Sequence, residues 1–139
     1  MKDFVNVGLL GAGTVGGGVL KVLEKNAEKI TKEVGKPVRI TKVLDRHVDR
    51  LKQEYGDKYI FTDNADEVLE DKEIDIIVEL LGREHPAKEF IARAFANGKH
   101  VVTANKDVLA KFGSELFPLA HEHNCDFMFE ASVCGGVSL

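Results

Sequence analysis

Long apolar runs are missing from this sequence, and cysteine is scarce. No stretch approaches the roughly 18 consecutive apolar residues of a membrane-spanning helix, so we expect no membrane insertion. The N-terminal segment MKDF leads directly into a strand-like segment and does not resemble the start of a signal peptide. The two cysteines, Cys125 and Cys134, do not form a CxxC pair and are expected to be free thiols. Together these features predict a cytoplasmic protein.

Concentrated positive charge is also missing. The chain carries 19 Lys and Arg residues against 23 Asp and Glu residues, and its basic residues are spread along the sequence. A phosphate backbone is normally bound by clustered basic residues, so we expect no nucleic-acid partner. The length of 139 residues, with 44% hydrophobic content, fits one domain with a single core.

Short apolar segments of strand length recur along the chain. The first is nearly uninterrupted, which is typical of a strand covered on both faces in a parallel sheet. The expected strands are Phe4–Leu10, Val38–Leu44, Tyr59–Thr62, Ile74–Leu81, His100–Thr103 and Asp126–Phe129.

Segments with helical spacing lie between these strands. A long helix should follow the first strand and end near Gly35. Further helices or turns are expected at Arg50–Tyr55, Asp66–Leu69, Pro86–Asn97, Lys106–Lys111 and Ser114–His123, with Ser114 as the N-cap of the last. The alternation predicts an α/β fold, a doubly wound, mostly parallel sheet with helices on both faces.

A glycine-rich motif, GAGTVG at residues 11–16, follows the first strand and opens the long helix. Gly11 allows a tight turn, Gly13 lets the backbone approach a pyrophosphate, and Gly16 permits close packing of the helix on the strand. Free N–H groups at the start of the helix, near Thr14 and Val15, attract the anion. The order of strand, glycines and helix predicts a Rossmann-type site for NAD or NADP, and an ordinary glycine-rich turn is the alternative.

An acidic residue, Asp45, stands at the end of the second expected strand. A carboxylate there normally binds the adenosine ribose hydroxyls and favours NAD. Its neighbour Arg46 could instead pair with the 2′-phosphate of NADP. The cofactor preference therefore stays open, and a solvated turn formed by Asp45 and Arg46 is the plain alternative.

Two further segments carry polar groups where strands end. Thr103, Asn105 and Lys106 follow the fifth strand and should face the cofactor crevice, because ligands gather at the carboxyl ends of parallel strands. Lys106 there could transfer a proton, polarise a carbonyl or hold a phosphate, although a lysine after a strand is more often simply exposed. Glu130, followed by small residues, could present a carboxylate and backbone carbonyls to a cation or an ammonium group, or belong to a fraying C-terminal turn.

Four segments in order, VGLLGAGTVGGGV, IDIIVELLG, GKHVVTANK and FEASVCGG, resemble the N-terminal region of homoserine dehydrogenases. The resemblance implies NAD(P)-dependent hydride transfer between aspartate semialdehyde and homoserine, a step towards threonine and methionine. It further implies that Gly11 to Gly16 hold the pyrophosphate and that Thr103 and Lys106 lie at the nicotinamide end, with Lys106 as a proposed catalytic residue. It also implies a sodium site, whose ligands would be Glu130, Val133, Gly135 and Val137.

The resemblance has two departures and two competing interpretations. Ser138 stands where the family usually has proline, which weakens the inference of a sodium site. The nucleotide-binding domain would span residues 1–139, and the region for substrate binding and homo-oligomer formation is expected after it, so this chain alone should not turn over substrate. A nucleotide-sensing regulatory domain would not need the lysine of TANK, whereas another amino-acid dehydrogenase is harder to exclude from these residues.

Overall fold

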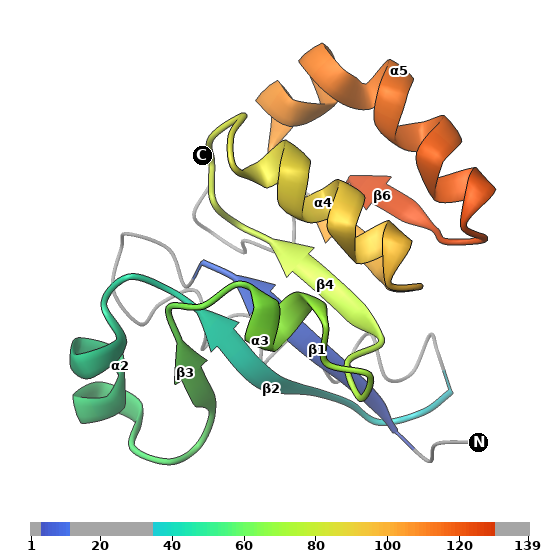
Figure 1. The fold of residues 1–139 in the computed structure, drawn as a ribbon. Coiled ribbons are helices and arrows are strands. Elements are labelled where there is room, and N and C mark those ends of the chain that lie inside the picture. The colour runs from blue at the N-terminus through green and yellow to red at the C-terminus, as the bar shows by residue number, and fades with distance from the viewer. Residues whose placement is uncertain (1–3, 12–34, 130–139) are drawn as a thin grey trace.

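The computed structural model describes residues 4–11 and 35–129, and these form one six-stranded sheet in which every paired strand is parallel (Figure 1). The strand order is β3-β2-β1-β4-β5-β6, which is the doubly wound order of dinucleotide-binding folds. The strands are β1 Val5–Leu10, β2 Val38–Leu44, β3 Ile60–Thr62, β4 Ile76–Glu79, β5 His100–Thr103 and β6 Phe127–Phe129. All six expected strands are therefore confirmed. The long helix predicted after the glycine motif lies outside the described residues.

Helices cover both faces of the sheet. The described helices are α2 Val48–Tyr55, α3 Asp66–Leu69, α4 Ala87–Ala96 and α5 Lys106–Glu122. Buried side chains of α3, α4 and α5 pack against one face, whereas Leu51 of α2 packs against the other. The predicted Rossmann-type arrangement is confirmed. Within the described ranges, no helix is both long and apolar enough to cross a membrane.

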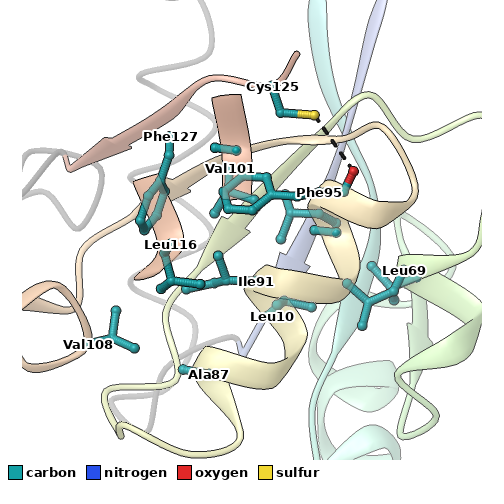
Figure 2. Close-up of a cluster of buried hydrophobic side chains, with 14 of the residues drawn as sticks. Leu10, Leu69, Ala87, Ile91, Phe95, Val101, Val108, Leu116, Cys125 and Phe127 are labelled. Atoms are coloured by element: carbon teal, nitrogen blue, oxygen red, sulfur yellow. Dashed lines mark hydrogen bonds between the residues drawn. The ribbon is translucent and has the colours of Figure 1, made fainter. Parts of the chain in front are cut away.

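The larger core lies between the sheet and helices α3, α4 and α5 (Figure 2). Phe95 and Ile91 of α4 are fully buried, and the Phe95 ring meets Phe127 of β6 edge-on with ring centroids 5.4 Å apart. The Cys125 thiol is a free thiol and donates to the Phe95 carbonyl at 3.9 Å. Burying each such large apolar side chain contributes about 1.5–3 kcal/mol, so this face holds α4 and α5 in place over β4 and β5.

Alternation along each strand sends the next side chain to the opposite face. Leu9, Val43 and Val78 form the smaller core there, together with Leu51, Tyr59 and Phe61. Strands buried on both faces appear in a sequence as nearly continuous apolar runs, which is why such strands could be predicted from the local sequence pattern.

The C-terminal helical region differs from the prediction of two helices. It is one helix, α5, with Gly113 inside it, and its N-cap is Asn105 instead of Ser114. The Asn105 side chain accepts a hydrogen bond from the Val108 N–H at 3.1 Å. Glycine costs a helix about 1 kcal/mol, but the buried stripe of Val108, Leu116 and Ala120 continues across Gly113 and offsets that cost.

Candidate functional site

The carboxyl ends of β1, β4 and β5 lie side by side at one edge of the sheet. Leu10 of β1 is in register with Glu79 of β4, which is in register with Thr103 of β5. From β1 the chain passes to β2 and β3 on one side, and β4, β5 and β6 occupy the other. The gap between β1 and β4 is thus the topological switch point, where open α/β sheets bind ligands.

Gly11 is the residue with which the chain leaves β1. Its φ of +88° lies in the region that favours glycine, and its N–H donates to the Leu44 carbonyl at 2.7 Å. A Cβ on Gly11 would lie 3.2 Å from Leu81 Cδ2 and 3.5 Å from the Leu80 carbonyl carbon and oxygen. Gly11 therefore has a backbone conformation that favours glycine, and it lies against the segment that follows β4. The tight turn predicted there stays a prediction, because its next residues lie outside the described range.

A buried carboxylate joins the ends of β4 and β5. Glu79 has 0% exposure, and its Oε1 accepts a hydrogen bond from Thr103 Oγ1 at 2.7 Å. Its Oε2 accepts from the Leu81 N–H at 2.7 Å. One side chain thereby fixes both the neighbouring strand and the first residues of the β4–α4 loop.

The same network continues into the start of α5. Thr103 Oγ1 also accepts from the Asn105 N–H at 3.0 Å, and Asn105 Nδ2 donates to the Arg83 carbonyl at 2.7 Å. Asn105 thus caps α5 and holds the β4–α4 loop at the same time. Lys106, the first residue of α5, follows directly and is exposed at this edge.

Burial raises the pKa of Glu79 above its ordinary value. The hydrogen bonds from Thr103, from the Leu81 and Gly82 backbone and from Asn105 act in the opposite direction, because they stabilise the ionised form. The two donors at 2.7 Å are a hydroxyl and a backbone amide, and both are neutral. The structure therefore retains a polar group in an environment that disfavours its charge.

Asp45 lies at the carboxyl end of β2, as predicted. Its N–H donates to the Thr62 carbonyl at 2.9 Å, and its Oδ1 accepts from the His47 N–H at 2.8 Å. The carboxylate therefore shapes the turn between β2 and α2. Its predicted contact with a ribose stays a prediction.

A hollow of about 530 Å³ opens beside this turn. Four basic residues line it, namely Arg46, His47, Arg50 and Lys52. The other lining residues are Val48, Asp49, Phe61, Thr62 and Asp63. The hollow lies where β2 and β3 end. Arg46, which was predicted to bind the cofactor, therefore shares this hollow with other basic residues.

Several predicted site residues lie outside the described residues. They are Gly13, Thr14, Val15 and Gly16 of the glycine motif, and the sodium-site candidates Glu130, Val133, Gly135 and Val137. Among the predicted residues that are described, Gly11, Thr103 and Lys106 lie at the β1, β4 and β5 edge, while Asp45 and Arg46 lie at the β2 edge.

Glu79 was not singled out from the sequence, nor were Arg50 and Lys52. The available signal for Glu79 was a carboxylate near the end of the largely apolar run IDIIVELL, which also contains Asp75. Arg50 and Lys52 gave no comparable signal, because exposed basic residues on a short helix are common.

Comparison with known proteins supplies the family. The family model described as the NAD-binding domain of homoserine dehydrogenase matches residues 11–130, which is most of the chain. This chain belongs to the homoserine dehydrogenase family. The resemblance stated from the four sequence motifs is confirmed.

Relatives in this family are substantially longer than the present chain. Homoserine dehydrogenases of Bacillus subtilis and Neisseria gonorrhoeae are 41% and 44% identical over 97% of this chain, which spans 31% of each relative. The crystal structure of a homoserine dehydrogenase from Thiobacillus denitrificans has a TM-score of 0.81 and 46% identity over 93% of this chain and 30% of its own. The chain therefore corresponds to the nucleotide-binding part of a homoserine dehydrogenase.

Proposed function

We propose that the carboxyl edge of the sheet binds NAD or NADP, with the pyrophosphate at the glycine motif between β1 and β4. The strand order carries this proposal, because it brings the motif to the switch point of a doubly wound sheet. Gly11 supports it, because its φ is positive. A Cβ there would lie 3.2 Å from Leu81 Cδ2 and 3.5 Å from the Leu80 backbone, so no side chain fits easily at this position. The residues of this edge therefore fit a dinucleotide.

The adenosine half is assigned to the edge at β2 and β3. Asp45 binds the ribose hydroxyls, and the basic hollow lined by Arg46, Arg50 and Lys52 favours the 2′-phosphate of NADP. The excess of basic over acidic residues in that hollow shifts the preference towards NADP. Asp45 opposes the shift, because a carboxylate repels a phosphate.

The nicotinamide half is assigned to the edge at β4 and β5, near Thr103 and Lys106. A bound reduced nicotinamide would donate a hydride to the aldehyde carbon of aspartate semialdehyde, and an oxidised nicotinamide would accept the hydride back from homoserine. Lys106, exposed and held at the capped start of α5, contacts the cofactor or moves a proton at its Nζ. Asn105 orients that helix start, so the position of Lys106 depends on the cap.

The complete reaction is assigned to a longer protein. The chain spans about 31% of its relatives, so the groups that hold the substrate are proposed to lie in the remaining part. The sodium site at Glu130, Val133, Gly135 and Val137, and assembly into a homo-oligomer, are parts of the same proposal.

The test is a calorimetric titration of the 139-residue chain with NADH and NADPH. We expect saturable binding, and we expect Gly13→Val to abolish it by filling the space that a pyrophosphate needs. Circular dichroism must show that the variant is folded. Unchanged affinity in a folded Gly13→Val protein would contradict the proposed site.

A further inference from the structure

We infer that Glu79 is a positioning residue for the nicotinamide half of the cofactor site. It acts by tying the β4–α4 loop, the end of β5 and the start of α5 into one hydrogen-bonded unit. This inference rests on the proposed function, and it goes further by naming a buried residue that the sequence did not single out.

The Glu79 carboxylate accepts two hydrogen bonds, one on each oxygen. Oε1 receives the Thr103 hydroxyl and Oε2 receives the Leu81 N–H, both at 2.7 Å. The two donors belong to different segments, one at the end of β5 and one in the loop after β4. Each oxygen of the carboxylate holds one of these donors, so the one side chain links both segments.

Hydrogen bonds connect Glu79 to the helix start that carries Lys106. Thr103 accepts from the Asn105 N–H at 3.0 Å, and the Asn105 side chain caps α5 at Val108 and donates to the Arg83 carbonyl. Glu79 thus fixes Thr103, Thr103 fixes the cap residue, and the cap residue precedes Lys106. The Arg83 contact returns the chain of hydrogen bonds to the same loop that Glu79 holds at Leu81.

Burial of the Glu79 carboxylate costs desolvation free energy. A carboxylate with 0% exposure is expensive to bury, and the Thr103 hydroxyl and the Leu81 amide that donate to it are neutral. An apolar side chain in that place would pack at the end of a strand whose residues Ile77 and Val78 are already buried. A costly polar group at the carboxyl edge is better explained by what it positions than by stability.

The location of Glu79 also separates the two halves of the site. Glu79 is in register with Leu10 and Thr103, whereas the basic hollow is formed by residues 46–63 at the ends of β2 and β3. A change at Glu79 should therefore affect the nicotinamide end more than the adenosine end.

The experiment compares NADH with ADP-ribose, which lacks the nicotinamide, as ligands of the 139-residue chain. Glu79→Met removes both acceptors at similar volume, and Thr103→Val removes the hydroxyl at similar shape. We expect each to weaken NADH about tenfold or more, because a buried donor or acceptor loses its partner. ADP-ribose should lose clearly less than NADH, because it shares only the pyrophosphate position beside Gly11 and Leu81 and lacks the nicotinamide. Glu79→Gln and Thr103→Ser, which keep part of the network, should lose less. Because both positions act in one network, the double variant should lose less than the product of the single losses.

Glu115→Gln is the matched control, since Glu115 is an exposed glutamate that pairs with Lys88 at 3.0 Å, and it should change neither affinity. Equal losses of both ligands in folded variants, or unchanged NADH affinity, would overturn the inference. If Glu79→Met does not fold by circular dichroism, Glu79→Gln, which loses one acceptor atom, decides by the same criteria. A wild-type chain that binds neither ligand would instead contradict the proposed function itself.

Discussion

Gly11 offers a direct test of how the chain leaves β1, and the perturbation is Gly11→Ala. The added methyl group meets two obstacles in the structure. The φ of +88° is unfavourable for a residue with a Cβ, and that Cβ would lie 3.2 Å from Leu81 Cδ2. Gly98 provides the matched control, because it has a φ of +73° but nothing within 4 Å of its Cβ position.

The expected magnitudes follow from separating these two obstacles. A positive φ costs a non-glycine residue about 1–2 kcal/mol, so Gly98→Ala should lower the free energy of unfolding by roughly that amount. Gly11→Ala adds crowding against Leu81 and the Leu80 backbone, for which about 1 kcal/mol or more is typical. At a typical unfolding entropy per residue, a chain of 139 residues loses roughly 3 °C in Tm for each kcal/mol.

Thermal unfolding followed by circular dichroism, and calorimetric titration with NADH, measure the two consequences. Gly11→Ala should lower the Tm by about 6 °C or more and weaken NADH, whereas Gly98→Ala should lower it by about 3–6 °C and leave NADH affinity unchanged. Equal Tm losses in the two variants would show that the contact with Leu81 is not restrictive. A stable Gly11→Ala protein with unchanged affinity would refute the tight turn as a requirement of the site.

Two further predictions concern cofactor choice and turnover. Arg46→Ala should weaken NADPH more than NADH by roughly 1.5–3 kcal/mol, because a charge-assisted contact with the 2′-phosphate is lost, and equal losses in calorimetry would exclude that contact. The 139-residue chain should not oxidise homoserine with NAD or NADP, since positioning of reactants accounts for about 7–11 kcal/mol of a barrier and the substrate-holding groups are proposed to lie elsewhere. Saturable turnover at the nicotinamide absorbance would require a substrate site within these residues.

The local sequence pattern predicted the strands of the sheet, because a buried strand requires a short run of apolar residues. Strands buried on both faces need apolar side chains at consecutive positions, and β1 and β4 come close to this. β2 carries Arg39, Thr41 and Lys42 and is buried only at Val43 and Leu44. The glycine motif predicted a dinucleotide site at the end of the first strand in the same local way, since strand, glycines and expected helix start are adjacent in sequence. Features of this kind need no knowledge of distant residues.

The local sequence pattern gave a wrong prediction at α5, because packing against distant residues decides whether this segment is one helix or two. Two shorter helices were predicted there, Lys106–Lys111 and Ser114–His123, and Gly113 lies between them, where glycine disfavours a helix interior. The structure keeps one helix, with Leu116 and Ala120 buried against the larger core. The energy that decides this point comes from packing against α4 and the sheet, which the local sequence does not display.

The polar network of the site depends on a still more distant condition, the register of β4 with β5. Glu79 faces Thr103 only because Ile77 pairs with Val101 and Val78 with Val102. A slip of one residue would turn Thr103 to the opposite face and leave the carboxylate without its partner. Ile77 and Val101 belong to the larger core, whereas Val78 belongs to the smaller core and Val102 packs against it. Burial of these four apolar residues on the correct faces therefore selects the register, and the register brings Glu79, Thr103 and the cap of α5 together at the carboxyl edge.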